Sequence, residues 1–217
     1  MAELIKSVLG QVNGQLNNLV FRKMNNKNFI SVRPKKYKPG KSQASKNVRN
    51  SFAMAVALAK SVNSVSILKK IWTESKAKGT NSYHKLMSCN TKLAEHGSLT
   101  TLNIITPAGL PLELDSASFE NKNLHLSFYC PPNRYLKYPA FLFVYLYFEE
   151  AGKSIVPVFA SLEETSPDGS YDIDLILDSR VRKIISKDPN PILYLALAGG
   201  TSYKKRAYWT TTASLQI

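Results

Sequence analysis

Acidic residues are absent from a long stretch near the N-terminus: none occurs between Glu3 and Glu74. The same stretch is rich in lysine and arginine, and residues 1–97 together hold 18 of these cations against 3 acids. Residues 98–217 hold 11 against 12, so the formal net charge of +14 belongs to the N-terminal part. This asymmetry indicates a polyanionic partner for one part of the chain and a separate role for the other.

Cysteines and long apolar runs are also scarce. Two cysteines, Cys89 and Cys130, cannot build the disulfide framework of a small secreted domain. The longest uninterrupted apolar run, Ala140–Phe148, is too short to cross a bilayer as a helix, and the first ten residues lack the apolar core of a signal peptide. We therefore expect a protein without membrane contact, either cytoplasmic or, if phage-encoded, part of a virion.

Histidines are few and far apart, which argues against metal and catalytic chemistry. No pair among His84, His96 and His125 has the spacing of metal ligands, and neither cysteine has a neighbour that would complete a zinc site. Cys89 could act as a nucleophile only if folding placed His84 or His96 beside it, and a buried thiol near surface histidines is the simpler interpretation. The sequence thus predicts a protein that is not an enzyme and holds no metal and no cofactor.

Residues 1–97 are expected to form a basic hairpin-plus-helix unit. Two β-prone runs within 19–33, separated by residues 25–28 with turn chemistry, predict a hairpin. Residues 33–40 carry two prolines among lysines and predict an extended basic arm. From Ser45, a suitable N-cap, apolar residues recur every three or four positions. This period predicts a helix, continued towards Trp72, whose buried stripe includes Val48, Phe52, Ala55, Ala59 and Val62.

After Gly97 the apolar period changes from 3.6 to 2, which predicts a second domain over 98–217. Six or seven short strand-like runs separated by turns are typical of a β-sandwich of the immunoglobulin or fibronectin type III kind. Asp172 and Asp174 alternate with apolar residues, as in a strand with one wet face. They share that face and could act as an acid and base pair or as cation ligands, although solvent-facing acids on an outer strand are the simpler interpretation. Pro157 indicates an edge strand. The predicted fold class is α+β.

Cations and aromatic residues are interleaved in the hairpin, the arm and the start of the helix. Clustered cations favour phosphates through counterion release, and exposed aromatic rings can stack on unpaired bases. The alternative is that these lysines only solvate an exposed segment. The candidate nucleic-acid-binding residues are Arg22, Lys23, Lys27, Arg33, Lys35, Lys36, Lys38, Lys41, Lys46 and Arg49, and the candidate stacking residues are Phe21, Phe29 and Tyr37.

A scattered set of positions resembles a known pattern. It comprises Gly10-x3-Gly14, the hairpin, Val32-Arg33-Pro34, Gln43, Arg49 and Phe52, then Trp72, Asn90 and the turn at Gly109. The pattern is similar to a family of uncharacterised bacterial proteins of about this length, labelled a domain of unknown function, and to the opening of some phage and prophage proteins regarded as structural. This resemblance implies no catalytic residue, and the lysine-rich arm departs from the usual pattern.

Two functional hypotheses follow. In the first, the protein is a non-enzymatic binding or structural protein whose basic unit contacts a polyanion, most simply nucleic acid, while the sandwich contacts proteins. In the second, it is a phage-like virion or assembly component whose main activity is self-association. An enzyme ranks third, because the sequence supplies no visible partners for catalytic groups.

Overall fold

The computed structural model describes residues 2–4, 14–24, 27–33, 40–120, 122–133, 136, 139–164, 166–199 and 207–217. The chain divides into two compact units, Met1–Lys41 and Ser42–Ile217. This division differs from the one expected at Gly97, because the helices of residues 43–90 belong to the second unit. Of the predicted turn at 25–28 and arm at 33–40, residues 25–26 and 34–39 lie outside the described residues, and Lys27 and Asn28 belong to a strand rather than to the turn.

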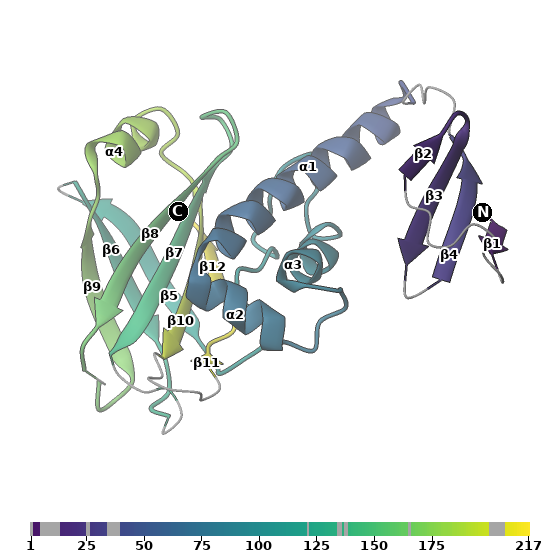
Figure 1. Cartoon of the computed structure of the whole chain (residues 1–217). Helices are drawn as coiled ribbons and strands as arrows, with labels where there is room; N and C mark the ends of the chain where they lie inside the picture. Colours follow the sequence, from purple (N-terminus) through teal and green to yellow (C-terminus); the bar gives the residue numbers. More distant parts are fainter. Residues whose placement is uncertain are drawn as a thin grey trace. The chain divides into compact units, whose positions relative to one another are not determined.

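The first unit is a single antiparallel sheet (Figure 1). Its strands are β1 (Ala2–Leu4), β2 (Gly14–Leu16), β3 (Leu19–Met24) and β4 (Lys27–Val32), in the order β1-β4-β3-β2. The β3–β4 pair confirms the predicted hairpin. A two-residue turn joins β2 to β3, and Asn17 adopts the left-handed φ of 51° there, a conformation that asparagine tolerates well.

The second unit opens with three helices, α1 (Gln43–Ser64), α2 (Ser66–Glu74) and α3 (Ser82–Asn90). Ser42 caps α1, since its Oγ accepts a hydrogen bond of 3.2 Å from the Ser45 N–H, so the prediction of Ser45 as the cap is wrong. The chain bends by 108° between α1 and α2 at Val65. Within the described part of the chain, no single helix is long and apolar enough to cross a membrane.

The buried face of α1 is rotated relative to the predicted stripe. Ala55, Ala59 and Val62 are buried as expected, together with Met54 and Leu58. The side chains of the other two predicted members are exposed, Val48 by 70% and Phe52 by 53%. Val48 precedes the first buried position, Ser51, and Phe52 lies just off the buried face that begins at Ser51, so their expected burial is wrong.

Two antiparallel sheets follow the helices. One contains β7 (Ala140–Phe148), β8 (Ser154–Leu162), β10 (Ile192–Gly199) and β11 (Tyr208–Trp209) in the order β11-β10-β7-β8, with β12 (Ala213–Gln216) also paired to β10. The other contains β5 (Glu113–Glu120), β6 (Asn123–Tyr129) and β9 (Ser170–Ile176) in the order β5-β6-β9. Strand β8 lies at the edge of its sheet, as Pro157 predicts. These elements confirm the α+β class.

A short helix, α4 (Ser179–Ile185), was not predicted from the sequence. Asp178 caps it by accepting hydrogen bonds from the N–H groups of Arg180 and Val181, at 2.7 and 2.8 Å. These bonds, with the Val181 N–H contributing most, lower the pKa of the Asp178 carboxyl. The helix is too short for an apolar period to reveal it.

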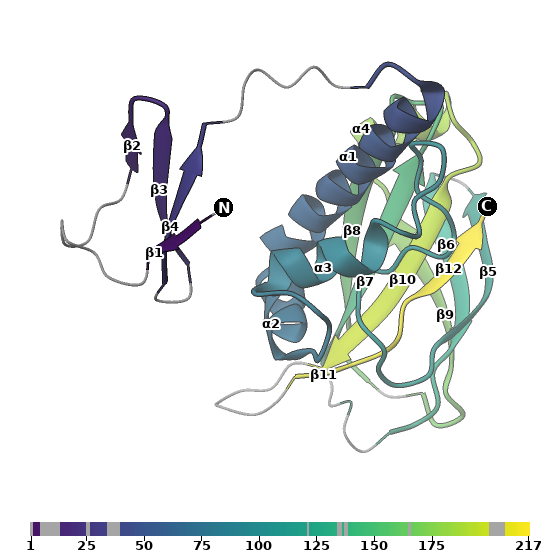
Figure 2. The same cartoon turned by 90° about the vertical axis from the view of Figure 1, so that its right-hand side faces the viewer.

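The five-stranded sheet is covered on both faces. Alternate residues of β7 point to opposite sides, so Leu142, Val144 and Leu146 join one core with β6 and β9, while Tyr145 and Tyr147 join another with α1, α2 and α3. Figure 2 shows the three helices on one side of β7 and β10 and the strands β5, β6 and β9 on the other. Burial on both faces explains why β7 is an unbroken apolar run. It also explains why the helices belong to the second unit.

Two buried polar side chains attach the helices to the segment at 103–106. The Trp72 indole donates a hydrogen bond of 2.8 Å to the Ile105 carbonyl. The Asn90 side chain accepts from the Ile104 N–H at 2.8 Å and donates to the Leu86 and Ile104 carbonyls at 3.1 and 2.9 Å. Both side chains are fully buried, so these positions of the family-like pattern have structural roles.

Candidate nucleic-acid interface

The register of the first unit sorts the predicted binding residues onto two faces. Arg22 of β3 pairs directly with Phe29 of β4, and one step along the strands Phe21 pairs with Ile30 and Lys23 with Asn28. Residues directly opposite in an antiparallel pair share a face, and successive residues alternate between faces. Arg22 and Phe29 therefore lie on one face, whereas Phe21 and Lys23 lie on the other.

We call the side that carries Arg22 and Phe29 the basic face. The Arg33 N–H donates a hydrogen bond of 2.6 Å to the Asn18 carbonyl, which extends the ladder by one pair and keeps Arg33 in phase with Phe29. By the same alternation, Lys27 is also on this side. Its members on β2, β3 and β4 and at the end of β4, as far as the structure describes their side chains, are Gln15, Val20, Arg22, Lys27, Phe29, Ser31 and Arg33.

Two cations neighbour the Phe29 position of the basic face on β3 and β4, whereas Glu3 of β1 is the residue paired with Phe29 on the other side of β4. The side chains of Arg22, Lys27 and Arg33 are exposed, and Phe29 is half-buried. Lys27 precedes Phe29 by two residues on β4, a separation of about 7 Å along an antiparallel strand. Arg22 is the direct cross-strand neighbour of Phe29. This geometry places a stackable ring within reach of two positive charges on an accessible surface.

The opposite side is the apolar face, made of Leu16, Leu19, Phe21, Ile30 and Val32. Leu16 is 67% exposed and Val32 is 71% exposed, so a large part of this face is accessible. Phe21 lies here with Lys23, two residues along β3, and on the opposite side from Arg22, Lys27 and Arg33. The structure therefore separates the two described stacking candidates, and only Phe29 lies beside Arg22.

Three of the remaining candidates are described outside this sheet. Lys41 is exposed at the end of the first unit, and Lys46 and Arg49 are exposed on α1 of the second unit. The Arg49 guanidinium donates a hydrogen bond of 3.0 Å to the Ser45 hydroxyl. The first turn of α1 carries no acidic residue. Four further candidates, Lys35, Lys36, Tyr37 and Lys38, lie outside the described residues.

His125 and Asp174 on the second unit form a close pair. The Nδ1 atom of His125 lies 2.7 Å from an Asp174 carboxylate oxygen on the outer side of the three-stranded sheet, where both side chains are exposed. The hydrogen bond with Asp174 raises the pKa of His125. Asp174 thus pairs with a histidine, and no hydrogen bond between it and Asp172 is found in the described part of the chain.

The Cys89 thiol has its pKa raised by burial, which disfavours a reactive thiolate. His84, the nearer of its possible bases in the sequence, has its Nδ1 atom 2.6 Å from the Thr80 hydroxyl. The residues that the structure describes contain no cluster of three or more histidine, cysteine or acidic side chains suited to a metal ion.

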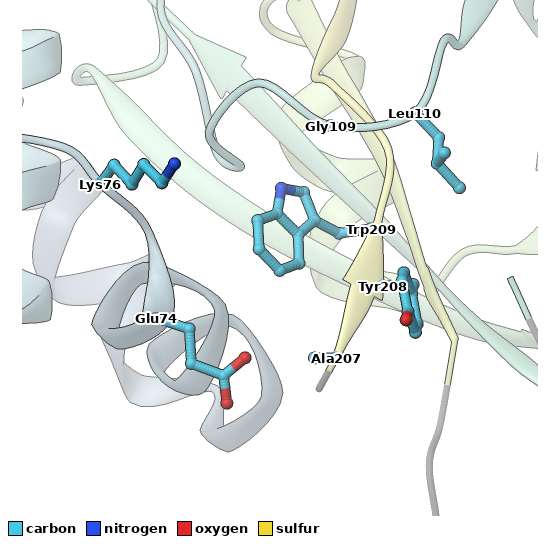
Figure 3. Close-up of a pocket in the computed structure, with 7 residues that line it drawn as sticks. All are labelled: Glu74, Lys76, Gly109, Leu110, Ala207, Tyr208 and Trp209. Atoms are coloured by element: carbon cyan, nitrogen blue, oxygen red, sulfur yellow. The ribbon is translucent and has the colours of Figure 1, made fainter. Parts of the chain in front are cut away.

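A cavity of about 630 Å³ opens in the second unit between the end of α2 and β11 (Figure 3). Its lining residues are Glu74, Lys76, Gly109, Leu110, Ala207, Tyr208 and Trp209. A second cavity of about 490 Å³ adjoins it and shares Glu74, Lys76 and Trp209. Sequence reasoning missed this site because its walls come from three separated segments. The only local signal was the turn at Gly109, where an added Cβ would lie 2.4 Å from the Trp209 carbonyl oxygen.

Neither protein-family models nor curated proteins match this sequence. The resemblance to an uncharacterised bacterial family and to phage structural proteins therefore stays a prediction. The function must be argued from the residues of this chain.

Proposed function

We propose that the protein is a non-enzymatic binding protein whose basic face contacts nucleic acid. The observation that carries this proposal is the direct cross-strand pairing of Arg22 with Phe29, with Lys27 and Arg33 on the same face. The net charge of +14 supports a polyanionic ligand.

Single strands should bind this face better than duplexes. Clustered cations bind the phosphates of single strands and of duplexes, because binding releases the counterions condensed on the nucleic acid. A flat sheet with one ring can in addition stack on a base, which requires that base to be unpaired, and such stacking contributes about 1–3 kcal/mol per base. Phosphate contacts and base stacking depend little on which base is present, so this face should bind many sequences with similar affinity.

A pair of adjacent charge reversals tests the face. Arg22→Glu and Lys23→Glu change the net charge equally on neighbouring exposed residues, but only Arg22 lies on the basic face. We expect Arg22→Glu to weaken binding of a labelled oligothymidylate, measured by fluorescence anisotropy, far more than Lys23→Glu does. Phe29→Ala should weaken the same complex by about 1–3 kcal/mol.

The salt dependence provides a second criterion. The logarithm of the binding constant should fall against the logarithm of the salt concentration with a slope of roughly −0.7 for each phosphate neutralised on a single strand. Changing Lys35, Lys36 and Lys38 together to Glu should weaken the binding of every sequence alike. Equal losses from Arg22→Glu and Lys23→Glu would show that general charge, and not this face, governs the affinity.

We further infer that the two sheets of the second unit form a fibronectin type III-like sandwich that makes protein contacts. The strands of the second unit can be given the letters used for such sandwiches. In chain order, A, B, C, C′, E, F and G stand for β5, β6, β7, β8, β9, β10 and β12. The strand order is then A-B-E in one sheet and G-F-C-C′ in the other. The central B–E and C–F pairs are those of immunoglobulin-like sandwiches, which supports the inference. Phe159 is 51% exposed on edge strand β8 and offers an apolar contact for a protein partner.

A second candidate function is that of a virion or assembly component that self-associates. The exposed apolar face of the first unit favours it, because a single-layer sheet needs a partner to cover such a face. The residues described in the first unit provide no helix for that purpose. The two functions are compatible, since the basic and apolar faces lie on opposite sides of the same sheet. The protein would then act in the cytoplasm or, if phage-borne, in the virion.

A further inference from the structure

Trp209 is held rigidly at the cavity between α2 and β11. Its indole N–H donates a hydrogen bond of 3.1 Å to the Pro107 carbonyl, and its own carbonyl accepts one of 2.9 Å from the Leu110 N–H. Gly109 packs against the ring so closely that an added Cβ would lie 2.7 Å from the indole Cδ1. The single donor of the indole is thus already used, so a ligand in the cavity can contact the ring only through its π surface and carbon edge.

The two charged side chains that line this cavity, Glu74 and Lys76, differ in whether a group of opposite charge already lies near them. The Glu74 carboxylate lies 4.0 Å from the Lys70 ammonium, so a cation already accompanies it. Lys76 is exposed, and Figure 3 shows its side chain extending towards the indole. In the part of the chain that the structure describes, Lys76 makes no hydrogen bond or ion pair. The other lining residues, Leu110, Ala207 and Tyr208, are mainly apolar.

These features select a ligand that carries both a flat ring and an anionic group. The ring would lie against Trp209, and the anion would accept hydrogen bonds from the Lys76 ammonium. An apolar peptide side chain would fill the same walls but would make no use of the cation. The volume of about 630 Å³ falls within the roughly 300–1,000 Å³ of small-ligand sites.

We propose that this cavity binds one unpaired nucleotide, with its base stacked on Trp209 and its phosphate on Lys76. Glu74 would accept a hydrogen bond from an amino group or hydroxyl of the nucleotide. This inference deepens the proposed nucleic-acid function, on which it rests for the identity of the ligand. It adds a site on the second unit, separate from the basic face of the first. The nucleotide can come free from solution or from a single strand.

The two tryptophans allow a direct test on the full chain. Trp72 is fully buried and its indole N–H is bonded to Ile105, so its NMR signal serves as an internal control. Thymidine monophosphate should shift the indole N–H signal of Trp209 and leave that of Trp72 in place, and Trp209→Phe assigns the two signals. One stacked base and one charge-assisted hydrogen bond should give a dissociation constant on the order of 1 mM or tighter.

Partial ligands separate the two contacts. Thymidine, which lacks the phosphate, should bind at least about tenfold more weakly than its monophosphate, because the hydrogen bond to the charged group is lost. Inorganic phosphate alone should leave the Trp209 signal unchanged. A hexathymidylate should shift the Trp209 signal at lower concentration than the monophosphate, because each strand offers several nucleotides to the cavity.

Two charge-reversal variants test whether Lys76 contacts the phosphate of the nucleotide. Lys76→Glu should weaken binding of the monophosphate by about tenfold or more. Lys78→Glu, two residues further along the same exposed segment and outside the lining of the described cavities, should change it little. The circular dichroism of both variants should match that of the unchanged chain.

Several outcomes would overturn the nucleotide site. They are a Trp209 signal that does not respond to the monophosphate, a shift caused by phosphate alone, equal binding of thymidine and its monophosphate, or equal losses from the two lysine variants. Arg22→Glu distinguishes this site from the basic face, since it should weaken oligothymidylate binding and leave the monophosphate shift at Trp209 intact. If Arg22→Glu leaves oligothymidylate binding unchanged and the Trp209 shift persists, the basic face is refuted as a binding site and the nucleotide site in the cavity is still supported.

Discussion

Removing the helices should unfold the sheets that sequence patterns marked as an independent domain. Four aromatic side chains of the five-stranded sheet, Phe143, Tyr145, Tyr147 and Tyr194, are buried in the core that includes α1, α2 and α3. We therefore expect a fragment of residues 42–217 to fold and a fragment of residues 98–217 to lose its fixed tertiary packing.

The magnitude follows from the buried area. An aromatic side chain buries about 150–250 Å². If deletion of the helices exposes half of that area on four rings, the lost burial costs about 8–12 kcal/mol at about 25 cal/mol per Å². Typical domains have a free energy of unfolding of about 5–15 kcal/mol, so the loss is comparable to the whole stability. The Tyr145 hydroxyl also loses its bond of 3.4 Å to the Ser61 carbonyl of α1.

Near-ultraviolet circular dichroism and thermal melting provide the assay. The 42–217 fragment should give the aromatic signal and the melting temperature of the second unit in the full chain, whereas 98–217 should give neither a fixed aromatic signal nor a cooperative transition. Two point mutations on α1 test the same shared core without deleting the helices. Leu58→Ala should cost about 2–5 kcal/mol because Leu58 is fully buried, and Phe52→Ala should cost far less because Phe52 is 53% exposed. A cooperative melt of 98–217 would refute the shared core.

Two further predictions concern the sheet surfaces. The Asp174 carboxylate favours protonated His125, so an NMR titration should give His125 a pKa above 6.5, and Asp174→Asn should lower that pKa. The pair stabilises the fold while His125 is protonated, and this contribution is lost as the pH rises through the raised pKa. An unchanged His125 pKa in the Asp174→Asn variant would contradict this account. If the apolar face mediates self-association, Val32→Lys should reduce the sedimentation coefficient of the full chain at unchanged melting temperature. Arg22→Ala, on the opposite face, should leave the coefficient unchanged, and a Val32→Lys chain of the same size would remove the assembly function.

Local signals predicted much of the secondary structure correctly. Alternating β-prone runs and turn residues identified the β3–β4 hairpin, and Pro157 marked β8 as an edge strand because proline cannot donate to a central ladder. The helical period located α1 but misplaced its buried face near Phe52. Periodicity reports which residues can share a face, but it reports neither which of two adjacent faces is covered nor where along the helix that cover begins.

The candidate site shows the same limit. Composition alone indicated that Arg22, Lys23, Phe21 and Phe29 belong to a basic and aromatic segment. Only the β3–β4 register decided that Arg22 and Phe29 share one face and that Lys23 and Phe21 share the other, because a shift by one residue exchanges the faces.

The sequence by itself determined the charge asymmetry, the α+β class and the positions of most strands, because these depend on residue type and on contacts close along the chain. Tertiary structure alone decided that the helices and the five-stranded sheet share a core, and that Lys76, Gly109 and Trp209 meet at one cavity. Lys76 and Trp209, for example, are 133 positions apart in the sequence. No local period or motif encodes such contacts, since they arise only when separate layers pack together.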